Sequence, residues 1–156
     1  MQEKENVIIR KAHYADIAPM TELLGDLFSI EKDFSFKPAL HSEGLKLLFA
    51  KPDSLILVAK QKNSVIGMIT LQQLISSAEG GYVGVVEDFV IDSNFRSKGI
   101  GIRLLDELFD WAAQNGLKRI QLAADKHNET ALNFYAKNGF KHSSMTMLYR
   151  KGSIND

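Results

Sequence analysis

The sequence contains no cysteine, which excludes disulfides, thiolate metal sites and a cysteine nucleophile. Any thiol that takes part in the chemistry must therefore arrive with a substrate. An excess of charge is missing as well, because 19 Lys and Arg residues balance 19 Asp and Glu residues. A protein that follows a nucleic-acid backbone normally carries a basic excess, so we expect no nucleic-acid partner.

Long apolar runs are also absent, because even the longest run of apolar residues is much shorter than a membrane span. The polar residues at the start of the chain lack the apolar segment of a secretory signal. We therefore expect a cytoplasmic protein with no membrane contact. We also expect no metal, because none of the histidines stands at metal-ligand spacing from a second ligand; they are His13, His41, His127 and His142.

The length and apolar content of the chain fit one globular domain, 1–156. Runs of β-branched and apolar residues predict strands, and apolar residues at helical spacing predict helices. Strands are expected at 7–10, 55–59, 65–71, 82–91, 120–124 and 140–150. Helices are expected at 15–28, 38–50, 99–114 and 129–137. This order predicts an α/β fold in which helices flank a mixed sheet.

A glycine-containing loop lies between an apolar strand and an amphipathic helix, and it runs Arg96-Ser97-Lys98-Gly99-Ile100-Gly101-Ile102. Two glycines allow a sharp turn whose N–H groups, with the positive end of the helix dipole, can bind anionic oxygens. Arg96 and Lys98 add cations suited to phosphates. The alternative is a tight turn with solvated basic residues. Leu104 replaces the third glycine of a dinucleotide fingerprint, and no Walker sequence follows Gly101.

Arg96-x-x-Gly99-x-Gly101 resembles the Q/R-x-x-G-x-G/A coenzyme A motif of the GNAT superfamily of N-acetyltransferases. The resemblance implies a GNAT fold with six to seven strands and about four helices. It also implies acetyl-CoA as the co-substrate, with its pyrophosphate on the loop amides. The end of the preceding strand would pair with the pantetheine arm through its backbone, at Phe89, Val90 and Ile91.

A second segment resembles the family signature N-x-x-A-x-x-F/Y-Y-x-x-x-G-F, with Asn128, Ala131, Phe134, Tyr135, Gly139 and Phe140 at the named positions. The resemblance implies that Asn128 and Ala131 contact the coenzyme and that Asn128 also caps its helix. A thiol has a pKa near ~8.5 and a phenol one of about 10, so Tyr135 can act as general acid toward the departing sulfur. Outside this motif, Tyr135 would be interpreted as a half-buried aromatic residue.

An acidic pair, Glu87-Asp88, interrupts an otherwise apolar strand. An unpaired carboxylate is costly to bury, so at least one of the two is expected to face a polar cleft. Glu87 is the candidate base for the acceptor amine, acting through water, and Asp88 is the second candidate. The alternative is that both face solvent at a strand irregularity. The Glu-Asp-Phe stretch most resembles the diamine and polyamine acetyltransferase branch.

In the GNAT family, the first two helices and the loop between them line the acceptor site. Here that loop contains Glu31 and Asp33, which could bind a small cationic amine, or could belong to a solvated turn. We expect acetyl transfer to the primary amine of a small molecule by direct attack on the thioester. The alternatives are a protein or peptide acceptor, and a non-catalytic acyl-CoA sensor. A homodimer is possible, because dimers are common in this family.

Overall fold

The structure, a computed structural model, describes residues 6–30 and 35–152. It divides the chain into two compact units, Met1–Leu122 and Ala123–Asp156. None of the described helices is long and apolar enough to cross a membrane. The single domain expected from the sequence stays a prediction.

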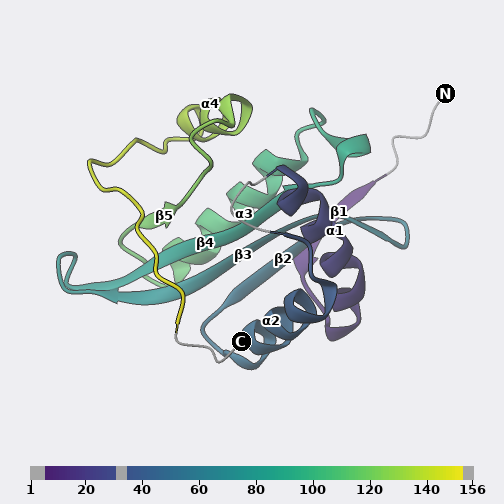
Figure 1. Cartoon of the computed structure of the whole chain (residues 1–156), viewed down its shortest axis with the longest axis horizontal. Coiled ribbons are helices and arrows are strands. Elements are labelled where there is room, and N and C mark those ends of the chain that lie inside the picture. Colours follow the sequence, from purple (N-terminus) through teal and green to yellow (C-terminus); the bar gives the residue numbers. More distant parts are fainter. Residues whose placement is uncertain (1–5, 31–34, 153–156) are drawn as a thin grey trace. The chain divides into compact units, whose positions relative to one another are not determined.

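The first unit is built on a five-stranded sheet in which the strands follow their order in the chain, as Figure 1 shows. These strands are β1 (Val7–Lys11), β2 (Leu55–Gln61), β3 (Ser64–Ser76), β4 (Gly81–Ile91) and β5 (Ile120–Leu122). The first four pair antiparallel, and β5 pairs parallel to β4. The sheet is therefore mixed, as the sequence predicted.

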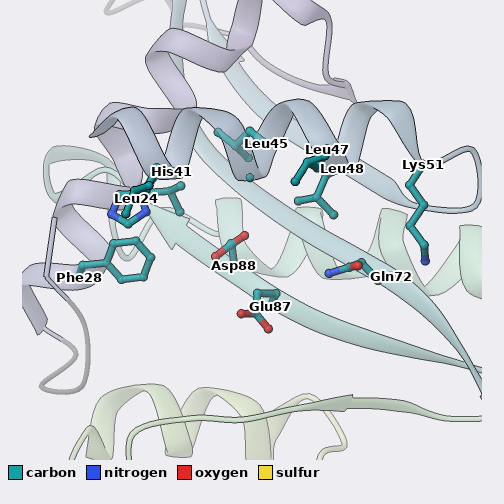
Figure 2. A pocket seen from close by; sticks show the side chains of 12 residues that line it. Leu24, Phe28, His41, Leu45, Leu47, Leu48, Lys51, Gln72, Glu87 and Asp88 are labelled. Atoms are coloured by element: carbon teal, nitrogen blue, oxygen red, sulfur yellow. The ribbon is translucent and has the colours of Figure 1, made fainter. Parts of the chain in front are cut away.

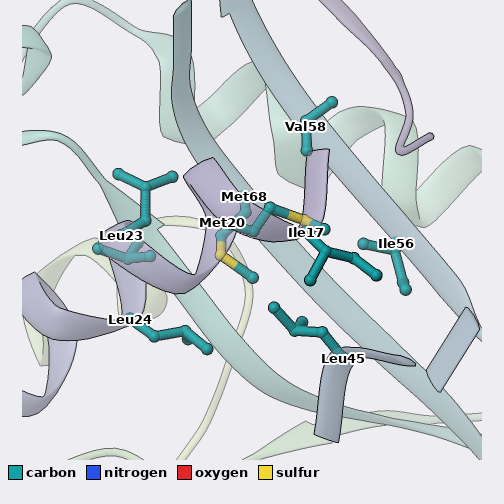
Figure 3. Packing of buried hydrophobic residues seen from close by; sticks show 9 residues of the cluster. Ile17, Met20, Leu23, Leu24, Leu45, Ile56, Val58 and Met68 are labelled. Atoms are coloured by element: carbon teal, nitrogen blue, oxygen red, sulfur yellow. The ribbon is translucent and has the colours of Figure 1, made fainter. Parts of the chain in front are cut away.

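Helices cover both faces of this sheet (Figure 1). They are α1 (Ile17–Ile30), α2 (Pro38–Ala50) and α3 (Ile100–Gln114), with short 3₁₀ turns η1 (Tyr14–Asp16) and η2 (Ser93–Phe95). Successive residues of a strand point to opposite faces. Ile56 and Val58 accordingly pack with α1 and α2, in the cluster of Figure 3. On the other face a Cβ at Gly67 would lie only 2.8 Å from Ile91 Cδ1, so glycine allows the close packing of β3 and β4 there.

Asp16 joins the start of α1 to β1. Its carboxylate accepts hydrogen bonds from Arg10 Nη1 at 2.7 Å and from the backbone N–H of His13 at 2.7 Å. Burial alone would raise the pKa of Asp16, but these hydrogen bonds and the positive charge of Arg10 hold it below its usual value. Helix α1 therefore begins at a defined point, and its own residues Met20 and Leu24 are buried.

The second unit contains α4 (Glu129–Lys137). Asn128 caps this helix, as the sequence predicted, because its Oδ1 accepts a hydrogen bond from the backbone N–H of Ala131 at 3.2 Å. The helix ends at Asn138, and Gly139 follows with φ at 90°. That left-handed conformation favours glycine and is common just after a helix.

The predicted strand at 140–150 is wrong, and the described residues form a sheet of five strands rather than six to seven. A strand is stabilised by hydrogen bonds to a neighbour, whereas here the N–H of Met145 bonds locally to the Ser143 hydroxyl at 3.1 Å. The apolar side chains of Met145 and Leu148 are 85% and 86% exposed. Local β-propensity did not suffice, because none of the described strands pairs with this segment.

Candidate functional site

A β-bulge in β4 places Glu87 and Asp88 together. In the ladder between β3 and β4, Ile69 pairs with Phe89 and Leu71 pairs with Val86. One residue of β3, Thr70, therefore lies opposite two residues of β4. In a regular strand these neighbouring carboxylates would point to opposite faces, but both line the same cavity on the α2 side of the sheet.

Thr70 and Asp88 form two hydrogen bonds across this bulge. The hydroxyl group of Thr70 donates to Asp88 Oδ2 at 3.1 Å, and it accepts a hydrogen bond from the backbone N–H of Asp88, also at 3.1 Å. Thr70 is fully buried and Asp88 is 9% exposed, whereas Glu87 is exposed. Burial, and secondarily the charge of Glu87, raise the pKa of Asp88 to about 6, against the lowering effect of the Thr70 hydrogen bond.

The carboxylates of this bulge face a cavity of about 420 Å³ beneath α2, shown in Figure 2. The cavity has the size of a small-molecule site. Its lining also includes His41, Lys51 and Gln72, together with apolar side chains from α1 and α2. Glu31 and Asp33, predicted to bind the acceptor, lie outside the described residues.

The glycine-containing loop has two residues in the left-handed region, Ser97 with φ at 61° and Gly99 with φ at 79°. Gly99 stands at the N-cap of α3 and supplies no capping side chain. The first N–H groups of a helix have no intrahelical partner, so those after Gly99 can donate hydrogen bonds to an anion. A Cβ at Gly99 would meet nothing within 4 Å. The space beside Gly99 is therefore open.

The two basic side chains of the loop contact residues of β4 and η2. Arg96 is exposed, and its Nε donates to the carbonyl of Ile91 at 3.1 Å, which ties the loop to the end of β4. Lys98 is also exposed, with its Nζ 5.4 Å from the ring centre of Phe95. By contrast, Ile100 is buried and anchors the first turn of α3. Gly101 is partly buried and Ile102 is exposed.

The edge of β4 beyond the bulge has a distinct pairing pattern. Its parallel partner β5 pairs with Gly84, Val85 and Val86 and goes no further. On the other side, the antiparallel ladder to β3 resumes at Phe89, Val90 and Ile91. Among the described strands, none pairs with Val90 or Ile91 on the β5 side. Their backbone groups on that side can therefore pair with an extended ligand.

The second sequence motif lies in α4, in the second unit. Tyr135 is half-buried, and its ring meets those of Phe134 and Phe140 edge-on, with ring centres 5.7 and 5.6 Å apart. The backbone N–H of Phe140 donates to the Tyr135 carbonyl at 3.0 Å. The motif residues therefore fix the orientation of the tyrosine within this unit. The N–H of Ala131 is the group that Asn128 caps.

The sequence did not indicate Thr70, His41 or Gln72 as site residues. A polar residue inside the apolar strand Val65–Leu71 was the available signal for Thr70. Its partner could not be identified, because the pairing depends on the extra residue in β4. The residues from α2 reach the cavity through tertiary packing alone. No group of three or more metal-binding side chains is found in the part of the chain that the structure describes, and the absence of a metal stays a prediction.

Comparisons with known proteins give a consistent result. The sequence profile of the Acetyltransferase (GNAT) family matches residues 19–140, more than half of the chain. An uncharacterized N-acetyltransferase, YhfO, of Bacillus subtilis is 30% identical over 140 residues, which cover 87% of this chain and 91% of that protein. The aminoalkylphosphonate N-acetyltransferase of Salmonella typhimurium is 24% identical over 147 residues, covering 92% and 93% of the two chains.

The fold is similar to that of solved acetyltransferases. The aminoglycoside N-acetyltransferase AAC(6')-Iy, solved in complex with CoA, superimposes with a TM-score of 0.82 at 14% sequence identity. The match covers 97% of this chain and 98% of that one. At this identity the similarity concerns the fold alone.

Proposed function

The chain belongs to the acetyltransferase (GNAT) family, and we propose that it transfers an acetyl group from acetyl-CoA to the primary amine of a small molecule. The observation that carries this proposal is the pair of carboxylates, one of them buried, on the wall of the cavity beneath α2. A small amine fits a concave site of this kind. A protein acceptor requires instead an open groove that accommodates a polypeptide segment.

We propose that the loop between β4 and α3 binds the pyrophosphate of acetyl-CoA. The amides from Ser97 to Ile102 would donate to the anionic oxygens, assisted by the positive end of α3 and by Arg96 and Lys98. The left-handed residues of the loop and the uncapped helix start support this assignment. The pantetheine arm would pair with the backbone of Phe89 to Ile91, at the end of β4, as the family resemblance implies.

The proposed chemistry needs one group that takes a proton and one that gives a proton. The acceptor amine attacks the thioester carbonyl, the carbon–sulfur bond breaks, and the acetyl group becomes an amide. Glu87 or Asp88 accepts the proton released by the amine, directly or through water. Tyr135 donates a proton to the departing sulfur, and Asn128 contacts the pantetheine arm from the start of α4.

The two carboxylates differ in suitability as a base. A general base is most effective when its pKa is near the working pH, and burial raises the pKa of Asp88 to about 6. Asp88 is also fixed by Thr70, whereas Glu87 is exposed. The structural features therefore favour Asp88, the second candidate from the sequence, with Glu87 beside it as an additional negative charge for the ammonium group.

Two experiments test the proposed function. Calorimetry measures the binding of CoA to the protein, and a thiol reagent measures the CoA released when acetyl-CoA and a panel of primary amines are added. We expect binding of CoA and thiol release that depends on the amine. CoA binding without thiol release on any amine would favour a non-catalytic sensor. The cytoplasmic location, the possible homodimer and the absence of a nucleic-acid partner stay predictions.

A further inference from the structure

The cavity beneath α2 has an uneven distribution of polar groups. Glu87 and Asp88 lie together on the sheet side, as Figure 2 shows. The α1 and α2 side is formed mainly by apolar residues, which are Leu24, Phe28, Leu40, Leu45, Leu47 and Leu48. A ligand that fits this lining needs a cationic end and an apolar body.

Two other polar residues of the cavity, Lys51 and His41, already have partners. Lys51 Nζ lies 3.2 Å from Asp53 Oδ1, which compensates its charge. The ring of His41 accepts a hydrogen bond at Nε2 from the backbone N–H of Lys37 at 2.8 Å and packs against Phe28, with ring centres 4.6 Å apart. Among the described lining residues, the acidic pair is therefore the charged group without a salt bridge, and it attracts one ammonium group.

We propose that the acceptor is a primary amine with one ammonium group and an apolar or aromatic body, which lies against α2 over Gly44. This inference rests on the proposed function and names the substrate class of the same site. It differs from the polyamine class, because a second ammonium would lie among leucines. A charge that loses water against apolar side chains without gaining a partner carries a desolvation cost.

Gly44 lines the cavity next to its apolar residues. It lies in the middle of α2, where glycine is unfavourable by about 0.5–1 kcal/mol relative to alanine. No left-handed backbone conformation requires it there, and a Cβ would meet nothing within 4 Å. Its missing side chain leaves room in the cavity that a larger residue would fill.

Matched amines test the substrate class. With acetyl-CoA at saturation, kcat/KM is measured by thiol release for ethylamine, butylamine, hexylamine and 1,6-diaminohexane. Each added methylene that is fully buried should raise kcat/KM by about fourfold. The kcat/KM for hexylamine should be more than tenfold higher than that for 1,6-diaminohexane, which has the same length and a second ammonium. Equal or better turnover of the diamine, or no increase with chain length, would overturn the proposal.

A pair of variants tests the position of the apolar body. Gly44→Leu places a side chain in the cavity, and Glu43→Leu adds the same side chain to an exposed position of α2 that does not line it. We expect Gly44→Leu to lose at least tenfold in kcat/KM for hexylamine and much less for ethylamine. Glu43→Leu should retain the preference for hexylamine. An equal loss for both amines in Gly44→Leu would contradict the assignment.

The two levels of the proposal fail in different ways. If none of the amines causes thiol release, the proposed function fails. If thiol is released but polyamines or aminoglycosides are preferred, the proposed function holds and the inference about substrate class fails. Calorimetric titration of hexylamine into the CoA-bound protein adds a readout independent of turnover. Weaker binding to Gly44→Leu than to Glu43→Leu is expected, and equal binding would contradict the position over Gly44.

Discussion

The hydroxyl of Thr70 both donates a hydrogen bond to the carboxylate of Asp88 and accepts one from its backbone N–H, each at 3.1 Å. The first bond stabilises the charged carboxylate, and the second satisfies an amide that a bulge removes from the ladder. A single buried side chain therefore fixes both the backbone and the acidic group of Asp88. Glu87, Lys51 and His41 are the other titratable residues that line the same cavity.

Substituting Thr70 should change the pH dependence of the reaction. In Thr70→Val the hydrogen bond that lowers the pKa of Asp88 is lost, so the acidic limb of kcat/KM, expected near pH 6, should move to higher pH. Thr70→Ser keeps the hydroxyl and should keep the limb in place. The measurement is a pH–rate profile with a thiol reagent between about pH 5 and 9.

Glu87→Gln is the complementary variant, because the negative charge of Glu87 raises the pKa of Asp88. Its removal should move the acidic limb to lower pH, opposite in direction to Thr70→Val. A limb that stays in place in both variants would exclude Asp88 as the base.

Asp88 should reduce stability at neutral pH. Its pKa is about 6 in the folded protein and 3.8 without burial, so the folded state binds more protons between these values. Stability contributed by this group is complete below the unfolded pKa and is lost as pH rises through the folded pKa. Asp88→Asn should therefore be stabilising above pH 6, by at most on the order of 3 kcal/mol. Thermal unfolding at pH 4 and pH 8 measures this.

The stabilisation by Asp88→Asn should disappear near pH 4, where the wild-type carboxyl group is protonated. Asparagine retains an oxygen that accepts from Thr70, so the bulge should persist. A stability difference that is the same at both pH values would contradict the raised pKa of Asp88.

Tyr135→Phe should separate turnover from coenzyme binding. The phenylalanine ring can retain the edge-on contacts with Phe134 and Phe140, so the fold of α4 should be preserved. Loss of a general acid costs roughly 10²–10⁴-fold in turnover. We expect a decrease of that size in kcat with CoA affinity retained, measured by stopped assays and calorimetry. Unchanged kcat would remove Tyr135 from the mechanism.

Gly101→Arg should abolish coenzyme binding, because a long side chain in the first turn of α3 occupies the space proposed for the pyrophosphate. The matched control is Asp106→Arg, an exposed position of the same helix. We expect no calorimetric binding of CoA by Gly101→Arg and normal binding by the control. Tight binding by Gly101→Arg would refute the assignment of the pyrophosphate to this loop.

The sequence predicted the elements whose signals are local. Helix α2 begins at Pro38 and ends before Pro52 because proline favours the first turn and disfavours continuation. Helix α4 was predicted with its bounds, because Asn128 and Gly139 are strong cap residues. The final segment was predicted as a strand from composition alone, and strands depend on a partner that composition does not specify.

The candidate site was predicted less completely than the fold. Its loop and its acidic pair follow from contiguous motifs, and the structure places both in one unit. The hydrogen bonds between Thr70 and Asp88, which are 18 positions apart, depend on the register shift between β3 and β4. The depth of the cavity at Gly44 depends on the packing of α2 over the sheet. Neither relationship has a signature in the local sequence.

The most direct test of acetyl transfer is to measure both products together. Acetyl-CoA and hexylamine are incubated with the protein, free thiol is followed optically, and N-acetylhexylamine is quantified by mass spectrometry. We predict one thiol released for each acetylated amine, and neither product when the amine is omitted. Coenzyme binding without acetylated product from any amine of the panel, or thiol release independent of the amine, would contradict the account.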